Sequence, residues 1–363
     1  MFQKLGLFLI ILTIITQPLS FLSTTHAQDD AEDTCDDIIT QALQVVGSSC
    51  AEMGRNETCY GNTQISAEFV ATPDNDFENP GDIVDALNLA SLTTAPLDLD
   101  QGIWGIALMQ ILADLPVEDD NALTLVLLGD AQLDTTTKTD DLQTFTFSSG
   151  QNETCESAPD GLLVHAPSGQ RARIVVNGVE LTFSSAAFLT AQPDDQMTVQ
   201  VIEGNVDATV DNQTIPISAG FYSSIDLDGL TADSAPSDPE PLEFANLDFL
   251  ITLAKLINQL LIDYGIIPVN PDPLPDGQAA IPPGTRIVVD VPEGFTGIAM
   301  YLGPPTADCV EPPIDDTVVP EGETGTVIAG PFLDTCNGIP YYLLYMDIGR
   351  IGWEGDRAFR PVE

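Results

Sequence analysis

Apolar and polar residues alternate in short segments through the middle of the chain, between residues 161 and 227. A period of two residues is typical of strands with one buried face. Asn177-Gly178 separates two such segments and suits a two-residue hairpin turn, because both residue types tolerate positive φ. Gly204-Asn205 separates the alternating segments 197–201 and 206–210, and we expect a second hairpin there. The region predicts roughly seven strands in a sandwich, barrel or rolled sheet.

The order of motifs in this region resembles that of the FecR-type extracellular or periplasmic domain. The segments are VNGVELTF, MTVQVIEGNVDATV and PISAG, and the resemblance spans about Gly161–Leu227. It implies a β-rich interaction and signalling module without catalytic residues, as a domain at 159–230. The family's role in iron uptake is not carried over, because we see neither an anti-sigma segment nor a membrane span ahead of the domain.

The preceding region, 28–158, also predicts mainly strands. Helical spacing of apolar residues favours one short N-terminal helix at Asp36–Val46, ended by Gly47. Strands are expected at 64–71, 83–92, 102–109, 123–128 and 145–147. The segment Ile103–Leu115 is apolar at almost every position, so its period does not separate strand from helix. Trp104 within it is expected in the core.

A linker rich in Pro, Asp and Ser follows, and residues 231–280 form a connecting region. Its segment 242–264 has a narrow polar stripe and a wide apolar face, which predicts one long amphipathic helix. That face packs on the protein's own domains or binds a partner. The sequence leaves both open.

The last region, 281–363, is a separate β-rich unit whose Gly-Pro turns and closing Gly352-Trp353 strand are similar to the bacterial Src-homology-3 type domain (about Ile281–Glu363). The resemblance implies a small β-barrel that binds cell-wall peptides, glycans or proteins without catalysis. By position it makes five aromatic residues candidates for a ligand groove: Tyr301, Tyr341, Tyr342, Tyr345 and Trp353. The alternative is that Trp353 and two of the tyrosines point into the barrel core.

The first 27 residues carry Lys4, the apolar segment Leu5–Ile15 and the ending Thr25-His26-Ala27. This pattern predicts a signal peptide cleaved after Ala27 and export to the cell surface or extracellular space. Retention of Leu5–Ile15 in the membrane is the alternative, although that segment is short for a span. We expect no stable membrane insertion.

Six cysteines lie in the exported part, and an even number outside the cytosol favours disulfides over zinc ligands. Cys309 and Cys336 stand apart near the C-terminus and are expected to pair. The connectivity of Cys35, Cys50, Cys59 and Cys155 stays open. Cys35 and Cys50 flank the predicted helix and are about 20 Å apart along it, too far for a direct bridge.

The formal net charge of −46 arises from 56 acidic residues against 10 Lys and Arg. Nucleic acid is excluded as a partner, because phosphate binding requires clustered cations. Only one histidine, His165, follows the signal peptide, and no nucleotide-binding glycine motif occurs, so we expect no catalytic residue, cofactor or metal site. The overall expectation is a mainly β, multidomain, exported binding protein whose partner is a wall glycan, a wall peptide or an extracellular protein. The alternatives are a carboxylate-dependent hydrolase and a structural surface-layer component.

Overall fold

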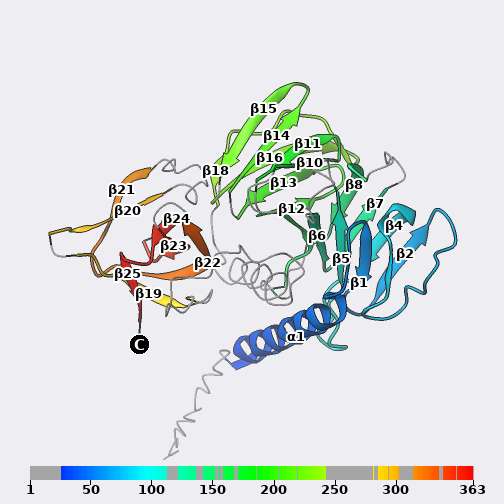
Figure 1. Ribbon diagram of the computed structural model, residues 1–363, viewed down its shortest axis with the longest axis horizontal. Coiled ribbons are helices and arrows are strands. Elements are labelled where there is room, and N and C mark those ends of the chain that lie inside the picture. Colours follow the sequence, from blue (N-terminus) through cyan, green and yellow to red (C-terminus); the bar gives the residue numbers. More distant parts are fainter. Residues whose placement is uncertain are drawn as a thin grey trace, which may run out of the picture.

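The computed structural model describes residues 26–112, 122–135, 142–151, 155, 158–166, 171–184, 186–202, 204–218, 220–242, 281, 285–292, 294–301, 314–334, 338–348 and 350–362. This part of the chain is mainly β, with one α-helix and three sheets (Figure 1). The mainly β, multi-sheet fold predicted from the sequence is thus confirmed. The apolar segment Leu5–Ile15, the helix predicted beyond residue 242, and Cys309 and Cys336 lie outside the described residues.

Two sheets form a sandwich. The first sheet has ten strands: β1 (Glu57–Tyr60), β3 (Ile83–Asp85), β5 (Ile106–Ile111), β6 (Leu123–Leu128), β9 (Gly161–His165), β12 (Ala186–Ala191), β13 (Gln196–Val201), β16 (Phe221–Asp228), β17 (Thr231–Ala232) and β18 (Glu240–Pro241). The second sheet has eight: β2 (Ile65–Phe69), β4 (Leu89–Thr94), β7 (Ala131–Asp134), β8 (Thr144–Ser149), β10 (Ala172–Val176), β11 (Val179–Phe183), β14 (Asn205–Val210) and β15 (Gln213–Ser218). Side chains from both sheets share one buried apolar cluster between them.

The sandwich is continuous across residues 158/159, where the sequence suggested a domain boundary. In the first sheet β6 pairs with β9, with Leu128 opposite Gly161. In the second sheet β8 pairs with β10, the strand that opens the Asn177-Gly178 hairpin. The chain moves from sheet to sheet after every one or two strands, and each sheet grows in nearly sequential order. Neither sheet breaks at the expected boundary.

Three central strands of the first sheet, β5, β6 and β9, are buried at every position. One face meets the second sheet, and the other meets helix α1 (His26–Cys50) through a separate apolar cluster. This double coverage explains why the segment from Ile103 showed no alternation. The strand within it begins at Ile106, later than the expected 102, and Trp104 is fully buried as expected.

Helix α1 is longer than the predicted Asp36–Val46 and begins at His26, so it includes the acidic segment that precedes Asp36. Two disulfides fasten the helix: Cys50, its last residue, pairs with Cys59 in β1, and Cys35, within the helix, pairs with Cys155. Figure 1 shows the C-terminal end of α1 beside β1 and β5.

The Asn177-Gly178 hairpin is confirmed, since β10 and β11 pair directly around it. The second predicted hairpin is wrong. Strand β13 pairs with β12 and β16 in the first sheet, whereas β14 pairs with β11 and β15 in the second. Alternation indicates only that a strand has one buried face, and strands of both sheets bury that face in the same core. The predicted strand at 83–92 is also interrupted, by the 3-10 turn η1 (Ala86–Asn88).

The C-terminal sheet has seven strands: β19 (Arg286–Val289), β20 (Gly297–Tyr301), β21 (Ile314–Pro320), β22 (Thr324–Asp334), β23 (Ile339–Met346), β24 (Arg350–Gly355) and β25 (Phe359–Pro361). It lies on the left of Figure 1, coloured yellow to red. Its order, β21-β20-β24-β23-β22-β19-β25, is open, because the described parts of β21 and β25 do not pair with each other. The described part of this sheet forms a half-barrel, in line with the small C-terminal β-barrel that the sequence predicts.

Candidate functional site

The five aromatic residues predicted to line a groove all lie in the C-terminal sheet, but on different faces. Trp353 pairs with Tyr301 and with Leu343, so Tyr301, Tyr341, Tyr345 and Trp353 share one face, and Tyr342 lies on the other. Trp353 and Tyr342 are 0% and 1% exposed. The rings of Tyr301 and Tyr341 meet edge to face, with centroids 5.8 Å apart. Only Tyr301, Tyr341 and Tyr345 keep partly exposed surface.

A hollow of about 930 Å³ lies at the other end of the molecule, where the β1 and β3 ends of the first sheet meet the loop after β2. Its lining includes the carboxylates Glu52, Glu57, Asp74 and Asp85, against one guanidinium, Arg55. Apolar side chains, including Pro73, Ile83, Val84 and Leu87, complete it. We call this feature the acidic hollow. A neighbouring depression of about 480 Å³ shares Asp74 and adds Asp76 and Asp82.

Hydrogen bonds hold the loop that walls the acidic hollow. The Asn88 side-chain amide donates to the Ala71 carbonyl and accepts from the Ala71 N–H, both at 2.9 Å. Asn75 donates to the carbonyl of Ile83 at 3.1 Å. Asp82 accepts from the backbone N–H groups of two residues of this loop, and these bonds lower its pKa. The wall is therefore built before any ligand arrives.

The part of the acidic hollow that comes from residues 52–57 is tied to helix α1. Glu57 opens β1 and accepts a hydrogen bond of 2.6 Å from the Gly54 N–H. The Cys50–Cys59 disulfide joins the end of α1 to the same strand. Asn56, between them, has φ of 57° and a buried Oδ1 without a hydrogen-bond partner. Asn56 itself lines the hollow, and its Oδ1 is enclosed within the protein.

A second, smaller pocket surrounds Asp160, which the sequence analysis did not single out. Asp160 is 7% exposed, and its Oδ1 accepts from the Asp130 N–H at 2.9 Å. Burial raises its pKa to about 6; the bond from Asp130 opposes this shift, and the Asp130 charge adds to it. The pocket has a volume of about 280 Å³ and is also lined by Phe188, Thr190 and Gln200. Asp160 precedes a strand as an ordinary turn residue, so the sequence carries no signal for its burial.

His165 lies in β9, opposite Thr124 of β6, and is 9% exposed. Burial lowers its pKa to about 4. Neither its Nδ1 nor the Thr124 hydroxyl has a hydrogen-bond partner. A histidine enclosed in this way is held neutral at pH 7 and touches neither the acidic hollow nor the Asp160 pocket.

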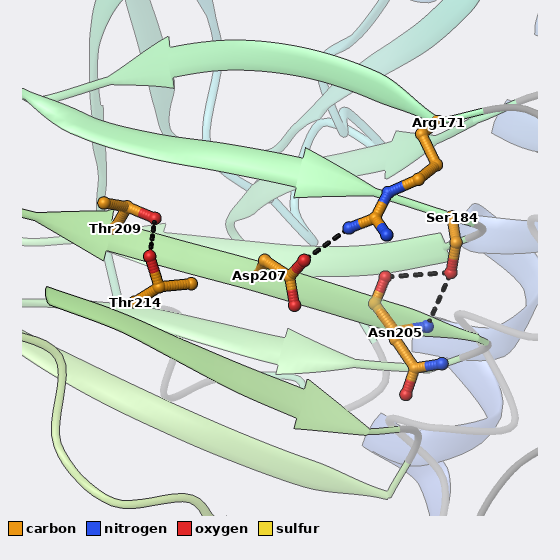
Figure 2. Close-up of polar contacts among 6 residues, drawn as sticks. All are labelled: Arg171, Ser184, Asn205, Asp207, Thr209 and Thr214. Carbon is orange, nitrogen blue, oxygen red and sulfur yellow. Dashed lines mark hydrogen bonds and ion pairs between the residues drawn. The ribbon is translucent and has the colours of Figure 1, made fainter. Parts of the chain in front are cut away.

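The outward face of the second sheet is polar (Figure 2). Arg171 forms an ion pair with Asp207 across the strands, and Arg173 forms one with Glu180 at 3.3 Å. Ser184 exchanges hydrogen bonds with the backbone of Asn205. These arginines are engaged by carboxylates and form no open cationic patch. Exposed pairs of this kind contribute at most about 1 kcal/mol each.

Within the described ranges, no three or more His, Cys, Asp or Glu side chains are placed to hold a metal ion. None of the helical residues described there forms a segment long and apolar enough to cross a membrane. The two disulfides are compatible with an extracellular or periplasmic location.

Comparisons with known proteins assign no family to this chain. No family model matches the chain, and no curated protein matches it. Two crystal structures of a predicted anti-sigma factor from Parabacteroides distasonis are similar at 8% identity and a TM-score of 0.27. The match covers 42% of this chain and 59% of that one. A likeness this slight carries no argument about fold or function.

Proposed function

We propose that this chain is an exported, non-enzymatic binding protein that docks onto a cell-wall component or an extracellular protein. The acidic hollow is the observation that carries the proposal. It combines a volume of about 930 Å³, four carboxylates in its lining, and a wall fixed by hydrogen bonds and a disulfide. Ligand sites are commonly prebuilt concavities of about 300–1,000 Å³, and binding residues gather on loops held by rigid sheets.

The two family resemblances are also part of this proposal. We propose that β9 to β16 are a FecR-like unit set within a longer sandwich, and that the C-terminal sheet is a relative of the bacterial Src-homology-3 type domain. Tyr301, Tyr341 and Tyr345 pack against the buried cluster that contains Trp353, and we propose that the part of each ring that stays exposed forms a secondary contact surface. Two disulfides in the described residues support export through the predicted signal peptide.

The test is retention of the purified chain on wall material isolated from its host, measured for three proteins. The proteins are the wild type, the hollow variant E52Q/D74N and the sheet variant Y345L. Retention that falls for E52Q/D74N and persists for Y345L supports binding through the acidic hollow. A wild type that passes through the wall fraction and forms no complex with purified extracellular proteins of the host contradicts the proposal.

One observation favours a second candidate, a carboxylate-dependent hydrolase. Asp160 has a raised pKa of about 6, lines a pocket and lies beside the carboxylate of Asp130. A carboxyl group that is partly protonated near neutral pH is suited to general acid catalysis. Turnover of a glycan panel by the wild type, abolished in D160N, would establish this candidate in place of the first. Absence of turnover together with wall retention supports the binding protein.

A further inference from the structure

We infer that the acidic hollow binds an amine of the lysine type, meaning a primary ammonium group carried on a flexible alkyl stem. This inference rests on the function proposed above and specifies the ligand of that site. It follows from the combination of charge, apolar lining and a wall held by hydrogen bonds in one concavity.

The charge of the hollow selects a cation. Four carboxylates of the lining, Glu52, Glu57, Asp74 and Asp85, face one guanidinium, and Asp76 and Asp82 of the neighbouring depression add to the negative potential. Glu52 and Asp74 form no ion pair with any residue in the described part of the chain. Such a concavity repels phosphates and carboxylates and concentrates cations.

The apolar lining selects among cations. Pro73, Ile83, Val84 and Leu87 lie within the same concavity as the carboxylates. Apolar side chains do not stabilise a bound inorganic cation, and the described residues hold no group of three or more His, Cys, Asp or Glu side chains placed to bind one. A lysine-type chain buries its methylene stem against apolar side chains while the ammonium reaches carboxylates. A lining that holds apolar and acidic side chains together matches both parts of that ligand.

The hydrogen-bonding groups also fit an ammonium, which has three donors and no acceptor. When ionised, the carboxylates of the lining only accept hydrogen bonds, so they match the three donors of an ammonium. Because the Asn88 and Asn75 amides already pin the loop over residues 71–75, little ordering is needed when a ligand binds. The hollow is wide enough for several residues, which favours a short peptide over a single amine.

The test is calorimetric titration of the full exported chain with tetralysine and with tetralysine acetylated on every side-chain amine. The site variant is E52Q/D74N. The matched control is E68Q/D238N, which removes the same number of charges at exposed positions that do not line the hollow. All four substituted side chains are exposed, so circular dichroism should show unchanged folding. Each titration is repeated at high salt.

We expect the wild type to bind tetralysine, with affinity that falls as salt is added. Affinity should drop about tenfold in E52Q/D74N and change less than about twofold in the control, and the acetylated peptide should not bind. Equal losses in the two variants, or equal binding of the acetylated peptide, would overturn the inference. If the wild type does not bind tetralysine but is retained on wall material, the amine ligand is refuted and the binding function stands. If it neither binds tetralysine nor is retained, both the amine ligand and the binding function are refuted.

Discussion

Replacing Asp160 by Asn should stabilise the protein at neutral pH and leave it unchanged in acid. The side chain is 7% exposed, and burial raises its pKa from 3.8 to about 6. The folded state therefore holds the proton more tightly than the unfolded state. Stability contributed by this group is complete below pH 3.8 and is lost as the pH rises to about 6.

The expected magnitude follows from the two pKa values. A tenfold change in proton affinity corresponds to about 1.4 kcal/mol, so ionisation of Asp160 costs up to about 3 kcal/mol of folding free energy. Asn removes that cost and keeps an oxygen that accepts the Asp130 N–H. The gain should be smaller where water reaches the pocket, because solvent screens the charge.

The assay is urea unfolding of the wild type and D160N at a series of pH values from 3.5 to 7, where the endpoints bracket the two pKa values. The difference in free energy of unfolding should be near zero at the acid end and should grow to about 1–3 kcal/mol in favour of D160N above pH 6. A difference that is independent of pH, or a variant less stable at pH 7, would refute the reasoning that burial dominates at this carboxyl.

Three other substitutions test the fold. The pKa of His165 is about 4 in the folded state, so the stability that this group contributes is lost as the pH falls from 6.5 towards 4. H165L should remove this loss of stability in acid, and urea unfolding of the variant at a series of pH values measures it. Asn177→Ala should cost about 2–4 kcal/mol in the same assay, because the Asn177 amide donates to and accepts from the backbone of Phe147 at 2.8 Å; a cost below about 0.5 kcal/mol would argue against these bonds. Removing the Cys35–Cys155 disulfide by double serine substitution should cost about 5 kcal/mol, against about 2.5 kcal/mol for Cys50–Cys59, because the first closes a far longer loop; the reverse order, measured as urea midpoints, would contradict this account of α1.

The sequence was informative where a local rule decides the structure. Asn177-Gly178 predicted its hairpin because both residues adopt positive φ, at 54° and 81°. The turn of the β14–β15 hairpin, Asp211-Asn212, has the same geometry, with φ of 48° and 65°, and its residue types could have signalled it. Local chemistry of this kind does not depend on the rest of the chain.

Long-range relations could not be predicted in the same way. The continuity of the sandwich depends on which strands pair, and alternation in β13 and β14 says nothing about the sheet to which each belongs. The pairing of Cys35 with Cys155 spans 120 residues and follows from the path of the whole sandwich. Members of the acidic hollow come from the turn between α1 and β1, from the loop after β2, and from β3 and η1, and each carboxylate looks in the sequence like an ordinary solvated acid. The sequence does not predict the burial of Asp160 for the same reason.

The most direct test of the acidic hollow as the binding site is zero-length carbodiimide coupling of tetralysine to the folded chain, followed by peptide mass spectrometry. This reaction joins an amine directly to an activated carboxylate, and at low tetralysine concentration a bound amine reacts fastest with the carboxylates that surround it, out of the 56 acidic residues of the chain. Coupling concentrated on Glu52, Glu57, Asp74 and Asp85, and suppressed by high salt, is the predicted result. Coupling spread evenly over the surface acids, or gathered beside the tyrosines of the C-terminal sheet, would contradict it.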